Sequence, residues 1–147
     1  MQELTGNLWD YLDKGILAIT TNGAVTRDGR ARLGQGAARQ AGERCPHLAA
    51  ELGKASCTGG NHVHPLSGGL VSFPVEDSPW SLPDPVLIRR SARELRDLAD
   101  RLGWSMVVVP RPGCGGGGLS WRDVAPLLAG VFDERFHVIT AGKVRQS

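Results

Sequence analysis

The sequence lacks both the long apolar run of a membrane protein and the apolar leader of a secreted one. No stretch of its 147 residues approaches the roughly 18 consecutive apolar residues that a membrane span needs. Residues 1–15 do not resemble a signal peptide, because charged side chains interrupt them at Glu3, Asp10, Asp13 and Lys14. We therefore expect a cytoplasmic protein that has no membrane partner.

Cysteine is scarce, and its positions exclude a disulfide scaffold. The three cysteines are an odd number without short regular spacings, so we expect reduced thiols at Cys45, Cys57 and Cys114. Soft and imidazole ligands for a tetrahedral zinc ion occur in one stretch, but their spacings match no standard zinc finger: Cys45, His47, Cys57, His62 and His64. We predict no metal site and no cofactor.

A strong excess of one charge is also missing. The 17 Lys and Arg residues against 15 Asp and Glu give a formal charge of +2, and like charges do not gather in blocks. This balance allows nucleic-acid binding without indicating it. Arg27, Arg30 and Arg32 either contact an anion or a nucleic acid, or form an ordinary solvated loop.

No internal repeat and no linker between apolar regions divides the chain. With 41% hydrophobic and 22% charged residues, its composition is typical of one globular domain with a continuous apolar core. We predict a single domain over residues 1–147.

The pattern of apolar residues predicts an α/β fold. Residues 15–20 form a short continuous apolar run with β-branched residues, typical of a strand that helices cover on both faces. An amphipathic helix follows Asp84 and Pro85, which supply an N-cap and a proline at the first helical position. From there the chain alternates strand, helix, strand, helix and strand, so we predict parallel strands in a three-layer α/β/α arrangement around a mixed, mostly parallel sheet.

The other predicted elements are shorter. We expect helices over residues 35–42 and 47–54, strands over 104–109 and 136–140, and a helix that begins at Ser120. Two further strands, 62–66 and 69–75, would form a hairpin joined at Ser67 and Gly68, with Pro65 placing the first strand at or near an edge. His62 and His64 would then share one face of that strand.

Glycine is abundant, and two clusters lie where a ligand site is expected. Residues 34–38 and 113–118 each lead directly into a predicted helix, whose first N–H groups have no intrahelical partner and attract an anion. Glycine lets the backbone approach that anion closely. Neither cluster is a Walker loop or a dinucleotide fingerprint, so we predict a diphosphate held without a P-loop. Structural connectors are the alternative.

Several single residues have two readings. Glu76 and Asp77 either activate water as general bases or are solvated acids in a loop. Trp80 either stacks on a base or plugs a gap in the packing. Cys114 is read as a small packing residue rather than a nucleophile, because no base lies near it in the sequence.

The motifs of the chain occur in the order seen in macrodomains, which this sequence resembles over nearly its whole length. The matching segments are Gly6–Trp9, Thr20–Gly23, Gly34–Ala38, Ser72–Pro74 and Pro112–Trp121. The last segment, Pro-Gly-Cys-Gly-Gly-Gly-Gly-Leu-Ser-Trp, is the most specific. It is most similar to the branch that contains DNA ADP-ribosyl glycohydrolase antitoxins and phage-type macrodomains.

The resemblance implies an ADP-ribose site. It assigns the adenine contact to Asn7 and Leu8, and the distal ribose to Asn22. It assigns the diphosphate to two loops, with residues Gly34, Gln35, Gly36, Ala37 and Ala38 in the first and Gly113, Cys114, Gly115, Gly116, Gly117 and Gly118 in the second.

The sequence also departs from the family pattern. Asn7 stands where the family usually has Asp, so the adenine amino group would meet a neutral acceptor. The antitoxin-like branch carries a lysine shortly after the Phe-Pro pair, but here Phe73-Pro74 is followed by Val75, Glu76 and Asp77. Residues 115–118 are all glycine, so the aspartate that some relatives place there is absent.

Three functions follow as expectations. The chain binds ADP-ribose, or a protein or nucleic acid that carries it, and hydrolyses the ADP-ribosyl linkage with Glu76 or Asp77 as the base. Alternatively, it reads ADP-ribose without catalysis, or it is a regulatory or interaction domain with purely structural glycine loops. We expect a monomer in each case.

Overall fold

The computed structural model describes residues 1–116 and 118–142, so the predicted ligand residue Gly117 lies outside the described residues. Six strands form one sheet in the order β1-β6-β5-β2-β4-β3. Only β3 runs antiparallel to its neighbour. The strands are β1 (Gln2–Thr5), β2 (Ile16–Asn22), β3 (Pro65–Leu66), β4 (Leu70–Glu76), β5 (Val107–Pro110) and β6 (Phe136–Thr140). The prediction of a mixed, mostly parallel sheet is confirmed.

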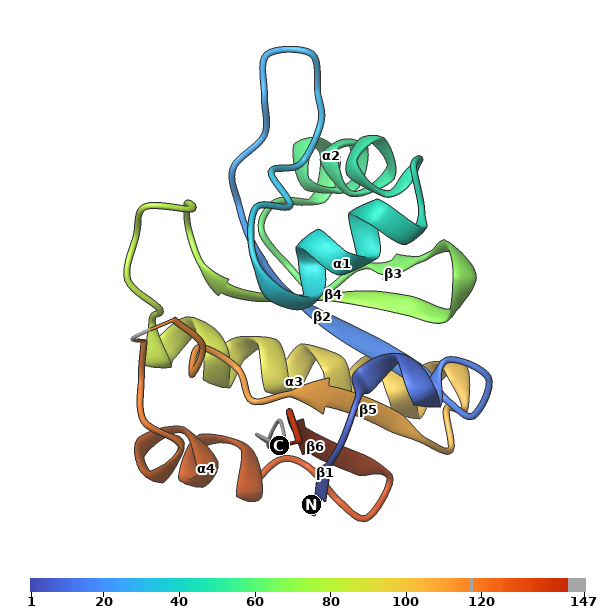
Figure 1. The fold of residues 1–147 in the computed structure, drawn as a ribbon, viewed down its shortest axis with the longest axis vertical. Helices are drawn as coiled ribbons and strands as arrows, with labels where there is room; N and C mark the ends of the chain where they lie inside the picture. The colour runs from blue at the N-terminus through green and yellow to red at the C-terminus, as the bar shows by residue number, and fades with distance from the viewer. Residues whose placement is uncertain (117, 143–147) are drawn as a thin grey trace, which may run out of the picture.

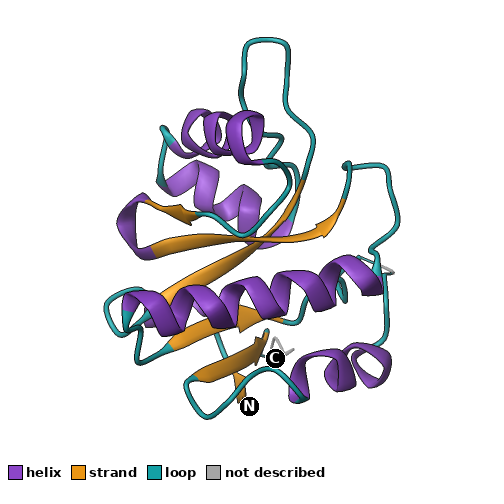
Figure 2. Ribbon diagram, turned by 180° about the vertical axis from the view of Figure 1, so that it is seen from behind, coloured by secondary structure: helices purple, strands orange, loops and turns teal. Residues whose placement is uncertain are grey.

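Helices cover both faces of this sheet. They are α1 (Gly36–Arg44), α2 (Leu48–Gly59), α3 (Pro85–Leu102) and α4 (Trp121–Ala129), with short 3₁₀ helices at Leu8–Tyr11 and Ser67–Gly69. α3 and α4 pack on one face, and α1 and α2 pack on the other. Figure 1 shows α1 and α2 together, and in Figure 2, seen from behind, α3 crosses in front of the strands. The three-layer prediction is confirmed.

Alternation along the central strand explains the two layers of core. In β2, Leu17 and Ile19 pack under α1 and α2, whereas Ala18 between them packs under α3. All three are fully buried, so β2 is apolar on both faces. Each fully buried leucine or isoleucine contributes roughly 1.5–3 kcal/mol of apolar transfer free energy. This burial fixes the register of β2 and hence the positions of the residues that follow it.

α3 begins as its sequence predicts. The Asp84 carboxylate accepts a hydrogen bond of 2.9 Å from the Val86 N–H, and Pro85 occupies the first turn. The helix ends at Gly103, whose φ of +69° is the left-handed conformation that favours glycine at a helix end.

Some predicted elements differ from the structure. Residues 62–64 are not a strand, because β3 contains only Pro65 and Leu66. The His62 ring instead pairs with Glu94, and a ring nitrogen of His64 lies 2.9 Å from the Gly60 carbonyl oxygen. The shared strand face predicted for these two histidines is therefore wrong. The predicted antiparallel pairing with β4 and the edge position of Pro65 are confirmed.

The fold brings three strand ends to one edge. β2, β4 and β5 are neighbouring parallel strands, so their carboxyl ends meet at the same edge of the sheet. Long segments project from this edge in Figure 1, one between β2 and α1 and one between β4 and α3.

None of the helices in the described residues combines the length and the apolar character that a membrane span requires.

Candidate functional site

A cavity of about 440 Å³ opens beyond the carboxyl ends of β2, β4 and β5. In open α/β sheets, this is where ligands bind, because loops there lead into helix N-termini. The walls come from the strand ends, the loop before α1, the segment between β4 and α3, and the glycine loop after β5. Both predicted glycine loops therefore line the same cavity.

The first glycine loop presents the start of α1 to this cavity. Its residues Gly34, Gln35, Gly36, Ala37 and Ala38 all line the cavity. Gln35 is the N-cap residue, and its side chain makes no capping hydrogen bond. The N–H groups of the first helical turn have no intrahelical partner, so they remain donors for a ligand.

The second glycine loop is a compact turn. The Leu119 N–H donates a 2.7 Å hydrogen bond to the Gly113 carbonyl, and the Gly118 N–H donates a 3.1 Å bond to the Gly115 carbonyl. A Cβ atom on Gly118 would lie 2.3 Å from the Gly113 oxygen, so that position has no room for a side chain. Gly116 has a φ of +58°, in the region that favours glycine. The loop therefore needs glycine for its shape.

Cys114 belongs to this loop but does not line the cavity. Its thiol lies 3.5 Å from the Pro112 carbonyl oxygen and packs against the core on the α3 side of the sheet. Burial raises the pKa of the Cys114 thiol, which keeps it protonated near neutral pH. These contacts agree with its reading as a packing residue.

The two loops approach one another across the cavity. A Cβ atom built on Gly116 would lie 3.9 Å from the side-chain oxygen of Gln35, which is van der Waals contact. Gly113, Gly115 and Gly118 line the cavity beside Gly116. The Gln35 side chain therefore reaches the second loop, and both loops border the space in which a small anion would lie.

Asn22, at the end of β2, lines the cavity with a side chain held in one orientation. Its Nδ2 donates to the Arg32 carbonyl at 3.1 Å, and its Oδ1 accepts from the Ala24 N–H at 2.9 Å. A primary amide has a second N–H and further lone pairs, so it retains capacity for a ligand hydroxyl.

Glu76 lines the same cavity at the end of β4, directly opposite Asn22 in the strand register. Partial burial raises the pKa of the Glu76 carboxyl, because removal from water disfavours its charged form. Asp77 is exposed and does not line the cavity. Of these two neighbouring carboxylates, therefore, Glu76 lines the cavity and Asp77 does not.

The residues assigned to adenine lie apart from the cavity. The Asn7 side chain caps the 3₁₀ helix Leu8–Tyr11 and accepts a 3.0 Å hydrogen bond from the Trp9 N–H. Leu8 is buried in the core beneath α1 and α2. Trp9 donates from its indole nitrogen to Gln40 in α1 at 2.8 Å. This segment therefore borders α1, outside the lined cavity.

The structure adds cavity residues that sequence reasoning did not single out. Arg111, directly before the second glycine loop, lies in the cavity wall, with its guanidinium 4.8 Å from the centre of the Trp121 ring. Arg32, which the sequence had already offered as one of three possible anion contacts, also lines the cavity. The segment between β4 and α3 contributes Pro79, Ser81, Leu82 and Pro83. The position of Arg111 beside the loop was the one available sequence signal.

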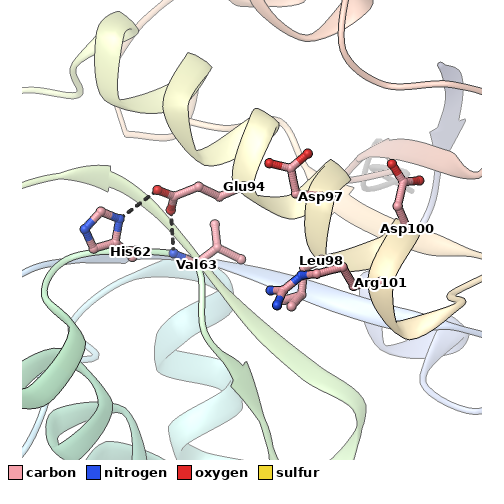
Figure 3. Close-up of a pocket in the computed structure, with 7 residues that line it drawn as sticks. All are labelled: His62, Val63, Glu94, Asp97, Leu98, Asp100 and Arg101. Atoms are coloured by element: carbon pink, nitrogen blue, oxygen red, sulfur yellow. Dashed lines mark hydrogen bonds and ion pairs between the residues drawn. The ribbon is translucent and has the colours of Figure 1, made fainter.

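A second hollow of about 580 Å³ lies between α3 and the segment that contains His62 and Val63. Figure 3 shows Glu94 pointing toward His62 and Val63 across this hollow. Glu94 lies 2.7 Å from the His62 ring and accepts a 3.0 Å bond from the Val63 N–H, so its oxygens are already engaged. Asp100, which also lines it, pairs with Arg135 at 2.6 Å. The cavity at the strand ends remains the better candidate site.

This arrangement of strands and helices is the macrodomain fold. The structure superposes on the macrodomain of DarG from Mycobacterium tuberculosis with a TM-score of 0.79 and 22% identity, covering 97% of this chain and 99% of that one. The macrodomain of Thermus aquaticus DarG gives a TM-score of 0.74 and 20% identity, with 97% of each chain covered. The macrodomain fold implied by the sequence motifs is confirmed.

A third similar structure contains a ligand. Thermosipho africanus DarTG in complex with ADP-ribose gives a TM-score of 0.73 at 16% identity, covering 95% of this chain and 41% of that one. The sequence itself matches no protein-family model and no curated protein.

Proposed function

We propose that this chain is a macrodomain that binds ADP-ribose, free or attached to a protein or nucleic acid. The observation that carries the proposal is the meeting of the two glycine loops in one cavity at the carboxyl edge of the sheet. The similar structure of DarTG with ADP-ribose supports this choice of ligand over other diphosphates.

The diphosphate would lie between the two glycine loops. The free N–H groups at the start of α1 attract anions, and Arg32 and Arg111 in the cavity wall add positive charge. The distal ribose would lie beside Asn22, and the adenine would extend toward Asn7 and Leu8. Gly117 and Cys114 would complete the second loop.

We further propose that Glu76 makes the site hydrolytic. Its carboxylate would accept a proton from a water molecule as that water attacks the anomeric carbon of the distal ribose. The bond from this carbon to the acceptor oxygen would break, and the acceptor would leave with the bonding electron pair and take up a proton from solvent water. The raised pKa of Glu76 suits a general base, because it increases the proton affinity of the carboxylate. Asp77 is the weaker candidate, because it is exposed outside the cavity.

A calorimetric titration of ADP-ribose, with AMP and NAD as comparison ligands, tests the binding proposal. Saturable heat for ADP-ribose, with weaker heat for AMP, is the expected result. Absence of heat at millimolar ADP-ribose would favour an interaction domain with structural glycine loops. Light scattering would test our expectation that the chain acts as a monomer.

A reader without catalysis is the second candidate. It is favoured by the lack of a lysine among the described residues that line the cavity, where Glu76 is the one carboxylate. Time-course release of ADP-ribose from modified protein, DNA and RNA separates the two functions. A reader binds these substrates without releasing ADP-ribose.

A further inference from the structure

Two large apolar side chains stand in solvent at the mouth of the cavity. Trp80 is 78% exposed and Leu82 is 84% exposed, and both belong to the segment between β4 and α3. Leu82 also lines the cavity, together with Pro79, Ser81 and Pro83. Exposed tryptophan at the edge of a cavity is typical of an interface, because its large ring contributes much of the contact energy in a complex.

The segment that carries these side chains is held by its own hydrogen bonds. The Ser81 N–H donates to the Ser78 carbonyl at 3.1 Å, and the Ser78 and Ser81 hydroxyls lie 2.5 Å apart. At its end, the Asp84 N–H donates to the Val75 carbonyl at 2.8 Å. Trp80 therefore lies in a turn that these hydrogen bonds stabilise, and its ring is exposed to solvent.

With the distal ribose beside Asn22 as proposed, this apolar surface would lie on the acceptor side of the site. The segment starts directly after Glu76, beside Asn22 and the proposed position of the distal ribose. A group attached to the anomeric carbon of that ribose would leave the cavity along Leu82 and Trp80. The surface is thus placed to contact the macromolecule that carries ADP-ribose.

The charge of the segment selects between classes of macromolecule. Residues 76–84 contain the carboxylates Glu76, Asp77 and Asp84 and no Lys, Arg or His. Arg32 and Arg111 lie in the cavity wall, but the solvent side of this segment presents the exposed Asp77, which attracts cationic side chains and repels a phosphodiester backbone. The next basic residues, Arg89 and Arg90, lie one turn into α3, and Arg90 already contacts the Asn61 carbonyl and Glu94.

We propose that Trp80 and Leu82 form a docking surface for a peptide with an apolar side chain next to Lys or Arg, so that the ADP-ribosylated target is a protein. This inference rests on the proposed ADP-ribose site. The apolar side chain of the peptide packs on the Trp80 ring, and its basic neighbour lies near Asp77.

Four ligands test the proposal on the intact chain. They are free ADP-ribose, an ADP-ribosylated peptide with Leu and Arg beside the modified serine, the same peptide with Glu in place of Arg, and an ADP-ribosylated single-stranded oligonucleotide. We expect the Arg peptide to bind more tightly than the Glu peptide and the oligonucleotide, with a preference that weakens at high salt. Equal affinity for the two peptides, or tighter binding of the oligonucleotide, overturns the proposal.

A Trp80→Ala variant adds an independent measurement. Loss of a central aromatic contact weakens binding by roughly 10- to 30-fold, so we expect that loss for the Arg peptide. Free ADP-ribose should bind this variant as it binds the unchanged chain, because Trp80 does not line the cavity. Leu102→Ala, at an exposed leucine at the far end of α3, is the matched control. Unchanged peptide affinity in Trp80→Ala contradicts the docking surface, whereas failure of free ADP-ribose to bind the unchanged chain contradicts the proposed function itself.

Discussion

Asn22 lies opposite Glu76 because the pairing of β2 with β4 shifts at their carboxyl ends. Thr21 pairs with Pro74, but Asn22 pairs with Glu76, so the register passes over Val75. Such irregularities are frequent beside functional sites, because they redirect a side chain without disturbing the rest of the sheet. Here the shift brings an amide and a carboxylate together at the cavity.

The carboxylate of this pair gives the first prediction. Glu76→Gln keeps the size of the side chain but removes its basicity, so release of ADP-ribose should fall by about 100-fold or more while ADP-ribose still binds. Asp77→Asn is the matched control and should retain most of the rate when the protein is in saturating excess over the substrate. Single-turnover assays beside calorimetry separate the two effects. A full rate in Glu76→Gln would remove this residue from the mechanism.

The pH dependence of release gives a second check on Glu76. A general base acts in its deprotonated form, so the rate should rise with pH as the Glu76 carboxyl ionises. Because burial raises its pKa, that rise should be centred above the ordinary value of a glutamate. A rate that is flat from pH 4 to 8 would argue against a titrating base at this position.

The second glycine loop requires glycine at position 118, because no space is left there for a side chain. In Gly118→Ala, the new methyl group would clash with the Gly113 carbonyl oxygen at 2.3 Å and push the loop apart. We expect ADP-ribose affinity to fall by about 10-fold or more, since a small displacement spoils several backbone contacts at once. Gly130→Ala, at the end of α4 with open space around it, is the control. Equal affinity in the two variants would mean that this loop does not hold the diphosphate.

Asn61 lies outside the cavity and positions the backbone of a residue that lines it. Its Nδ2 donates to the Glu76 carbonyl at 3.2 Å, and its own carbonyl accepts from Arg90 on α3. Gly23, directly after Asn22, packs against the Asn61 side chain. Asn61→Asp keeps the shape but loses the donor, so we expect several-fold weaker ADP-ribose binding with a small change in thermal stability. Asn61→Gln, which keeps an amide donor, should recover part of the affinity if positioning is the cause.

How much of this could be read from the sequence depends on the kind of signal. α3 was predictable because its apolar spacing and its Asp84-Pro85 start are local. The glycine loops were predictable as neighbours because parallel strands bring their carboxyl ends to one edge. β1 was not predicted, because this strand has only four residues, and most of them are exposed and give no apolar pattern. The contacts of Asn61 depend on tertiary packing of distant segments, for which a single sequence carries no signal.

The ion pairs behind α3 give the last prediction, which concerns stability. Asp133 accepts hydrogen bonds from Arg135 at 3.0 and 2.8 Å, and Arg135 holds the pKa of the Asp133 carboxyl at about 2. Because this folded-state pKa lies below the unfolded value, the pair stabilises the fold above about pH 4 and loses that effect as the pH falls toward 2. Asp133→Asn should therefore lower the free energy of unfolding by about 1 kcal/mol near neutral pH, the size of a partly exposed pair.

This difference in the free energy of unfolding should decrease in acid. In urea unfolding at pH 7, 4 and 2, the difference between the unchanged chain and Asp133→Asn should be largely kept at pH 4 and shrink at pH 2, because protonation of Asp133 removes the charge that the variant lacks. Asp97→Asn is the matched control. Asp97 is an exposed carboxylate on α3, and it forms no ion pair within 4 Å with any of the described residues. Its effect should be small at every pH. A difference for Asp133→Asn that stays constant from pH 7 to 2 would show that the carboxylate acts through packing rather than through its charge.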